Sequence, residues 1–229
     1  MTPKRALFIL TSHDRLGPRE ATGARPTGFH LGETATPWRR LRAEGIEVDF
    51  ASVRGGRPPM TGHDPDDPDQ RAFLADPEGG GRLERTPKAE EADPAAYAAV
   101  YFVGGHGTMW DFRAHPALHT LGRAVHEAGG VVAAICHGPA ALADLTLSDG
   151  THLVAGRELT AFPHAAEVAR DLAGVVPFPL QTTLEQRGAH FTSAPDRTPH
   201  AVRSGRLLTA QNPQSAALLA AHLADLLRP

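Results

Sequence analysis

Short apolar runs, separated by helical or glycine-rich segments, are the feature that most restricts what this chain can fold into. Residues 6–11, 98–103 and 131–135 are almost continuously apolar, which is typical of strands buried on both faces of a parallel sheet. Residues 28–44 repeat apolar side chains at helical spacing, and residues 46–53 form a second predicted strand. Strand, helix and strand in succession make a βαβ unit. The sequence therefore predicts an α/β protein, a three-layer sandwich of flavodoxin-like type with a mostly parallel sheet and helices on both faces.

This alternation is interrupted once. Residues 54–94 are rich in glycine, proline and acidic side chains, and only residues 70–75 among them look helical. Strand patterns resume directly afterwards, so we predict a loop insertion within a single domain of residues 1–229, of the kind that covers a site or contacts a partner. The other expected elements are helices at 116–128, 139–145, 165–173, 180–187 and 213–227, and short strands at 157–161, at 189–191 and as a pair within 202–209.

Composition narrows the class of protein. The net charge of −3 and the isoelectric point near 6.5 give no basic surface for nucleic acid. A single cysteine excludes an internal disulfide and is typical of a reducing compartment. The apolar run near the N-terminus is too short for a secretion signal, and no run is long enough to cross a bilayer. We therefore expect a cytoplasmic protein that binds neither nucleic acid nor membranes.

The one cysteine, Cys136, stands where a strand turns into a helical pattern, in GGVVAAICHGPAAL. A nucleophile elbow has this strand–turn–helix form and needs small residues near its tip, here Ala134 and Gly138. A lone cysteine is often an inert core residue, but this context favours a reactive thiol. We expect the N-terminus of the following helix to lower the pKa of the thiol. His137 could then deprotonate or orient it.

A glycine-rich loop, GGHG at residues 104–107, follows the strand at 98–103. In an open parallel sheet, ligands bind at the carboxyl ends of the strands, so this loop and Cys136 should lie together. The backbone amides of Gly105 and His137 could form an oxyanion hole, with His106 beside them at the substrate. An ordinary glycine turn is the alternative interpretation.

We predict neither a metal nor a cofactor. His115 and His119 have a helical spacing that could bind a metal, but no third ligand is indicated. The acidic run at 63–67 matches no calcium loop and is more typical of a solvated turn.

The motifs AAICHGP, GGHGTMWDF, TGFHLGETATPW and GRLLTAQNPQSA together resemble the ThiJ/PfpI superfamily, whose fold is similar to that of class I glutamine amidotransferases. Within it, the chain is most similar to the branch of heat-shock chaperones with glutathione-independent glyoxalase III activity. The resemblance covers nearly the whole chain and is weakest across residues 54–94. It implies a homodimer.

The resemblance also implies roles for individual residues. The family nucleophile falls on Cys136, and the adjacent histidine falls on His137. The acid beside the sulfur falls on Glu33, whose pKa should be raised by proximity and burial. The acid that orients the histidine falls on Glu167. Without the resemblance, Glu33 would be interpreted as a surface helix residue in an ion pair.

The implied activity is that of a glutathione-independent glyoxalase (glyoxalase III, D-lactate dehydratase). Such an enzyme converts methylglyoxal or a related 2-oxoaldehyde to a 2-hydroxy acid without a cofactor. The Cys136 thiolate would add to the aldehyde carbon, and Glu33 or His137 would move a proton between the two carbons. The alternatives are a holdase chaperone that binds unfolded clients, another cysteine-dependent hydrolase of the superfamily (deglycase, amidase or peptidase), and an oxidation sensor. The chain departs from the branch at residues 31–32 and 162–164, which puts substrate preference in question.

Overall fold

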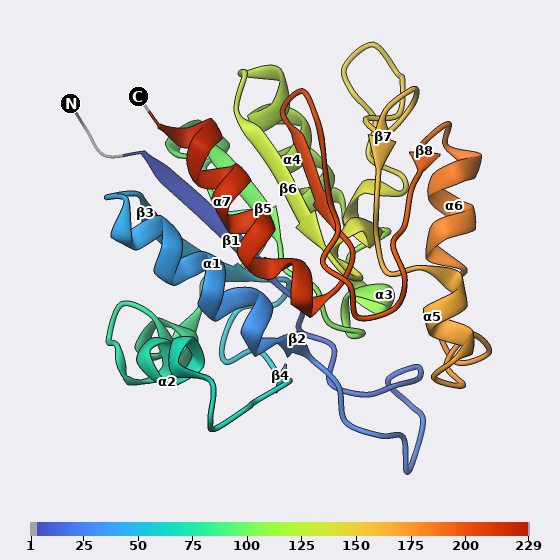
Figure 1. Ribbon diagram of the computed structural model, residues 1–229, viewed down its shortest axis with the longest axis horizontal. Coiled ribbons are helices and arrows are strands. Elements are labelled where there is room, and N and C mark those ends of the chain that lie inside the picture. Colours follow the sequence, from blue (N-terminus) through green and yellow to red (C-terminus); the bar gives the residue numbers. More distant parts are fainter. Residues whose placement is uncertain (1–3, 229) are drawn as a thin grey trace.

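A six-stranded sheet forms the centre of the computed structural model, which describes residues 4–228 (Figure 1). All neighbouring strands are parallel except the last pair, β10 and β9. In sheet order the strands are β3 (Glu47–Ser52), β1 (Arg5–Leu10), β5 (Ala99–Phe102), β6 (Val131–Ile135), β10 (Leu207–Ala210) and β9 (Ala201–Ser204). The predicted fold class, a mostly parallel α/β sheet, is confirmed.

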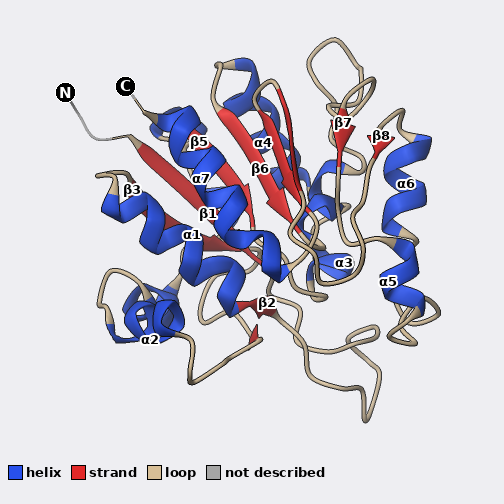
Figure 2. Cartoon of the chain, in the orientation of Figure 1, coloured by secondary structure: helices blue, strands red, loops and turns tan. Residues whose placement is uncertain are grey.

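Helices cover both faces of this sheet, which gives the fold three layers (Figure 2). Along β1, Phe8 and Leu10 pack into the core on one face, and Leu7 and Ile9 pack into the core on the other. Both faces are therefore dry, which explains why the central strands are apolar at successive positions. One face is covered by α1 (Leu31–Ala43), α2 (Pro68–Ala75) and α7 (Ala216–Leu227), and the other by α4 (Pro116–Glu127) and α6 (Leu180–Gln186).

Helix α1 begins later than the spacing predicts. Phe29–His30 form a short strand, β2, because Phe29 donates its N–H to the Pro59 oxygen at 2.9 Å and β2 pairs with β4 (Met60–Thr61). Gly28 lies so close to the Pro59 backbone that any Cβ there would overlap it. Pro37 lies inside α1 without ending it.

The segment predicted as a loop at 54–94 is instead largely folded. Besides β4 and α2 it contains 3₁₀ helices at Gly80–Arg85, Ala89–Glu91 and Pro94–Ala96. Asp67, at the end of the acidic run, caps α2 by accepting hydrogen bonds from the N–H groups of Asp69 and Gln70. The acidic run thus ends in a helix cap, a local structural role.

Other elements differ from the prediction in length and type. The expected helix at 139–145 is a 3₁₀ helix over Gly138–Leu142, and the one at 165–173 is the short α5 (His164–Val168). The expected strands at 157–161 and 189–191 form a separate two-stranded sheet of β7 (Glu158–Leu159) and β8 (His190–Phe191). A short helix that was not predicted, α3 (Thr108–Asp111), follows the glycine-rich loop, and a 3₁₀ turn at Pro213–Ser215 precedes α7. None of the helices within residues 4–228 has the length and apolar character needed to cross a bilayer.

Candidate active site

The turn after β6 holds Cys136 in a strained backbone conformation. Its φ is +58°, in the left-handed region that a non-glycine residue rarely adopts. The turn is held from both sides: the Cys136 N–H donates to the Ala210 oxygen and the Phe162 N–H donates to the Cys136 oxygen, each at 2.8 Å. Gly138 is required because a Cβ there would overlap the backbone oxygen of Phe102. This is the geometry of a nucleophile elbow.

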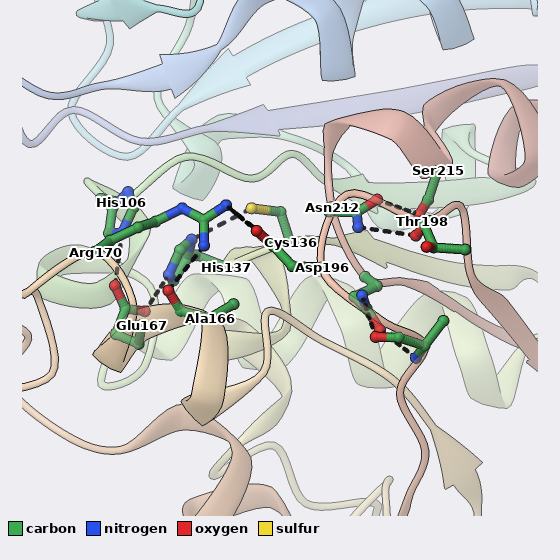
Figure 3. A network of polar contacts seen from close by, with 12 residues as sticks. His106, Cys136, His137, Ala166, Glu167, Arg170, Asp196, Thr198, Asn212 and Ser215 are labelled. Atoms are coloured by element: carbon green, nitrogen blue, oxygen red, sulfur yellow. Dashed lines mark hydrogen bonds and ion pairs between the residues drawn. The ribbon is translucent and has the colours of Figure 1, made fainter.

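Hydrogen bonds link Cys136 to a pair of histidines that share one carboxylate (Figure 3). The sulfur lies 3.3 Å from Nδ1 of His137, and Nε2 of His137 lies 2.7 Å from Oε2 of Glu167. Nε2 of His106 lies 2.8 Å from the other oxygen, Oε1. The structure thus brings Cys136, His137, Glu167 and His106 together. The contact between His106 and Glu167 has no counterpart in the sequence-based expectations.

Burial and hydrogen bonding define the charges in this cluster. Burial opposes ionisation of Glu167, but the hydrogen bonds from His106 and His137 outweigh it and hold the pKa of the carboxyl well below its usual range. Burial, with His106 as a further cause, lowers the pKa of His137 to about 4. A neutral imidazole has a single N–H. If His137 donates it from Nε2 to Glu167, Nδ1 is left as an acceptor that faces the thiol.

Glu33, in the first turn of α1, is fully buried beside the cysteine. A Cβ on Gly104 would overlap Oε2 of Glu33 and lie 2.8 Å from Cβ of Cys136, so these groups meet at one point. Burial raises the pKa of Glu33 to about 8, although the Cys136 thiol and the Gly104 amide partly offset it. Neither of these contacts has full hydrogen-bond geometry. Glu33 is therefore protonated at neutral pH and can act as a proton donor.

The pKa of the thiol shifts in the direction opposite to the prediction. Burial raises the pKa of Cys136 well above its usual value, and the adjacent Glu33 raises it further. The prediction of a lowered pKa was wrong for two structural reasons. Cys136 is only 5% exposed, and a short 3₁₀ helix replaces the α-helix whose dipole was expected to stabilise the thiolate. The resting thiol keeps its proton and must transfer it in order to react.

The glycine-rich loop after β5 lies at the same edge of the sheet, as expected. Gly105 has a φ of +113° and approaches the backbone of Gly28 so closely that a side chain would overlap it. The His137 N–H lies beside the Cys136 sulfur and slightly favours the thiolate. An oxyanion hole formed by the amides of Gly105 and His137 stays a prediction.

Cys136 opens into a cavity of about 260 Å³. Phe162 forms part of its wall and stacks on His137, with ring centroids 4.5 Å apart and planes 26° apart. The segment 162–164 thus reaches the pocket through Phe162. The other lining residues had no role in the sequence analysis and come from distant segments: His30, Thr61, Arg170, Arg197, Asn212, Pro213 and Gln214.

Some of these residues lay within recognisable motifs. His30 is part of TGFHLGETATPW, and Asn212 is part of GRLLTAQNPQSA, so these motifs could have suggested pocket residues. Arg170 and Arg197 belong to neither motif, and only the tertiary structure brings them to the cavity.

Within residues 4–228, one group of side chains has the spacing of a metal site. Ligand atoms of His106, His137 and Glu167 all lie within 4.8 Å of one another. The short distances from Glu167 to each histidine are those of direct hydrogen bonds, which metal binding would have to replace. The pair His115 and His119 is not part of any such group, and Nε2 of His119 lies 2.9 Å from the Arg113 oxygen. That the protein works without a metal stays a prediction.

Comparison with known proteins assigns the chain to a family. The sequence model of the DJ-1/PfpI family matches residues 25–226. The chain belongs to the DJ-1/PfpI family. The superfamily resemblance read from the motifs is thereby confirmed.

Proteins similar to this chain in sequence include two that are named glyoxalases. The glutathione-independent glyoxalase HSP31 of Saccharomyces cerevisiae is 30% identical over 248 residues, which cover 100% of both chains. Glyoxalase 3 of Candida albicans is 28% identical and covers 93% of each chain.

Two solved structures share the fold of this chain. The 24 kDa Rapid Encystment Protein of Francisella tularensis superposes with a TM-score of 0.93 at 32% identity, covering 99% of this chain and 100% of that one. Glyoxalase III of Candida albicans superposes with a TM-score of 0.86 at 26% identity, covering 97% of each chain.

Proposed function

We propose that this protein is a glutathione-independent glyoxalase that converts methylglyoxal, or a related 2-oxoaldehyde, and water to a 2-hydroxy acid. The observation that carries the proposal is the arrangement around one buried thiol. Cys136 contacts His137, which contacts Glu167, and a protonated Glu33 lies beside the sulfur. The proposal draws further support from relatives that are named glyoxalases along their full length.

The first step is addition of sulfur to the aldehyde carbon. His137 accepts the S–H proton at Nδ1 while the S–C bond forms and then passes it to the aldehyde oxygen, which becomes the hydroxyl of a hemithioacetal. In this step the amides of Gly105 and His137 stabilise the developing oxyanion. Glu167 holds the protonated imidazole through its charged hydrogen bond, and His106 shares that carboxylate at the edge of the substrate.

The second step moves a proton between carbons. A base removes the hydrogen from the first carbon to give an enediolate, and an acid returns a proton to the second carbon. We assign the base to His137, which is neutral at rest, and the acid to Glu33, which is protonated at rest. A hydroxyl proton passes between the two substrate oxygens to give the thioester, and the proton gained by His137 replaces the one lost by Glu33. Water then cleaves the thioester, which releases the 2-hydroxy acid and restores the thiol.

Three further proposals concern the chain as a whole: its domain organisation, its location and its oligomeric state. We propose that the whole chain acts as one domain, because the strands on either side of residues 54–94 both pair with β1. A cytoplasmic location is supported by the single cysteine. A homodimer is supported only by the family resemblance.

The deciding experiment measures lactate formation from methylglyoxal without glutathione or added metal. The wild-type protein should turn over. Cys136→Ala should abolish turnover, and Glu33→Gln should lower kcat by roughly 10²- to 10⁴-fold because an amide cannot transfer a proton. Glu158→Gln, which changes an exposed carboxylate on β7, is the matched control and should behave as wild type.

Other outcomes would assign a different function. Wild-type turnover by Cys136→Ala would refute the mechanism. Peptide or amide cleavage that depends on Cys136, without lactate formation, would favour a hydrolase. Suppression of client aggregation by a folded protein that forms no lactate would favour a holdase chaperone.

A further inference from the structure

The wall of the catalytic cavity carries positive charge that the proposed reaction of methylglyoxal does not use. Of the residues that line it, Arg170 and Arg197 are basic and none is acidic. Glu33 and Glu167 are buried and do not line the cavity. The lining of the cavity thus supplies two guanidinium groups, and no lining residue carries a carboxylate.

The two arginines differ in their partners. Figure 3 shows Arg170 with Asp196 beside the histidine pair. Its Nη2 lies 3.1 and 3.2 Å from the two Asp196 carboxylate oxygens, Nη1 donates to the Ala166 oxygen at 2.8 Å, and the guanidinium lies 4.9 Å from the Phe162 ring centre. Within residues 4–228, the Arg197 side chain forms neither an ion pair nor a hydrogen bond. Arg197 is exposed to solvent, and it is the cavity arginine that no carboxylate of the described residues pairs with.

The backbone at Arg197 gives an independent reason to assign it a role. Its φ is +59°, in a tight turn where the Thr198 N–H donates to the Pro195 oxygen at 3.1 Å. Glycine or asparagine is usual at such a position, because other side chains are strained there. Strained backbone positions cluster at active sites and ligand-binding sites, so the strain at Arg197 in the cavity wall supports a role in binding.

The volume of the cavity points to a substrate larger than methylglyoxal. About 260 Å³ is available, which approaches the lower end of the roughly 300–1,000 Å³ typical of small-molecule sites. Methylglyoxal has only three carbons and two oxygens. The space that remains is bounded in part by Arg197.

We infer that the preferred substrates are 2-oxoaldehydes that carry a carboxylate at the end remote from the aldehyde, with Arg197 binding that carboxylate. The inference rests on the proposed function and names its substrate class. The reaction is unchanged: sulfur attacks the aldehyde carbon, one water is consumed, and the remote carboxylate takes no part in bond making. The product is a 2-hydroxydicarboxylate.

The test compares two substrates of equal carbon number. One is 4,5-dioxopentanoate, which would give 2-hydroxyglutarate, and the other is 2-oxopentanal, its neutral counterpart with a methyl group in place of the carboxylate. The measured quantity is the ratio of their kcat/KM values. For the wild-type protein we expect kcat/KM to be about tenfold higher for 4,5-dioxopentanoate than for 2-oxopentanal. This corresponds to the lower end of the stabilisation that a hydrogen bond to a charged group provides. The ratio should fall in high salt, because salt screens the charges.

Variants test whether Arg197 causes the preference for the substrate with a carboxylate. Arg197→Gly relieves the backbone strain, so it should fold, and it should reduce the ratio by about tenfold. Arg197→Lys keeps the charge and should retain part of the preference. Arg203→Ala removes an exposed arginine from β9, outside the cavity, and should leave the ratio unchanged.

The possible negative results distinguish failure of the Arg197 inference from failure of the proposed glyoxalase function. A wild-type ratio near one, or a ratio that survives Arg197→Gly, overturns the inference while methylglyoxal turnover leaves the proposed function intact. If no 2-oxoaldehyde is turned over, the proposed function fails. Calorimetric titration of wild type with the same two compounds then decides the inference, since equal affinities would overturn it.

Discussion

The Glu167 carboxylate contacts two imidazoles: Oε1 contacts His106 and Oε2 contacts His137. A carboxylate can accept from both N–H groups, and this fixes both the orientation of His137 and the nitrogen that keeps its proton. An amide offers one acceptor oxygen and an NH₂ group, so it can accept from only one of the two histidines and requires the other to present an unprotonated nitrogen. The charge of Glu167, as well as its shape, is therefore needed at this position.

We expect Glu167→Gln to lower kcat by about 10²-fold with little change in KM, because the substitution alters the protonation and orientation of His137. ¹⁵N NMR of the imidazoles should show that His137 loses its single tautomer, a signal that a purely structural role would not change. Glu158→Gln provides the control. An unchanged tautomer together with unchanged kcat would exclude this positioning role.

At the scale of single residues, the sequence predicted which side chains lie together better than it predicted the pKa of the thiol. Cys136, His137, Glu33 and Glu167 meet as expected. The pKa of the thiol was predicted in the wrong direction, because the degree of burial depends on how β6 packs within the whole sheet. The rim arginine Arg197 could not be foreseen for a similar reason, since no local pattern links it to Cys136.

Among the elements, the elbow after β6 depends on backbone approaches that leave no room for a side chain. Gly138 lies against the oxygen of Phe102, and Gly104 lies between Glu33 and the Cys136 turn. In both places the neighbour is main chain or a fully buried group, so it cannot move aside without displacing the nucleophile.

We predict that Gly138→Ala destabilises the protein by about 1–3 kcal/mol, through overpacking against β5, and impairs turnover. Urea unfolding and lactate formation measure the two effects. Gly174→Ala is the matched control, because a Cβ there meets no atom within 4 Å, and it should leave both unchanged. Wild-type stability in Gly138→Ala would show that the elbow tolerates movement.

The long elements were predictable because burial on two faces demands continuous apolar strands and amphipathic helices. The short ones were not. Strands β2 and β4 span two residues each and exist because the chain on either side brings them together. The same applies to the 3₁₀ helices within 54–94, where glycine and proline were interpreted as signs of a loop.

Across the whole molecule, buried titratable groups lower the free energy of unfolding both when the pH rises and when it falls. Glu33 has a pKa of about 8 against an ordinary 4.5, so the folded state binds more protons than the unfolded state between these values. Its burial therefore costs stability progressively as pH rises from about 4.5 to 8. His137 has the opposite effect, because its lowered pKa costs stability as pH falls from 6.5 to about 4.

We expect Glu33→Gln to remove the alkaline part of this dependence. The free energy of unfolding of the variant should rise relative to wild type between pH 5 and 8, by on the order of 4–5 kcal/mol, and the difference should then level off. Urea titrations at several pH values measure it. A difference that stays constant with pH would mean that Glu33 ionises normally in the folded protein.

Cys136 is the chain's single sulfhydryl and lies almost wholly beneath the surface. A thiol-directed label can therefore attach nowhere else. The moles of iodoacetamide incorporated per mole of chain count the intact nucleophiles in a preparation. The contrast between this small reagent and a bulky maleimide reports how wide the entrance becomes as the native protein fluctuates.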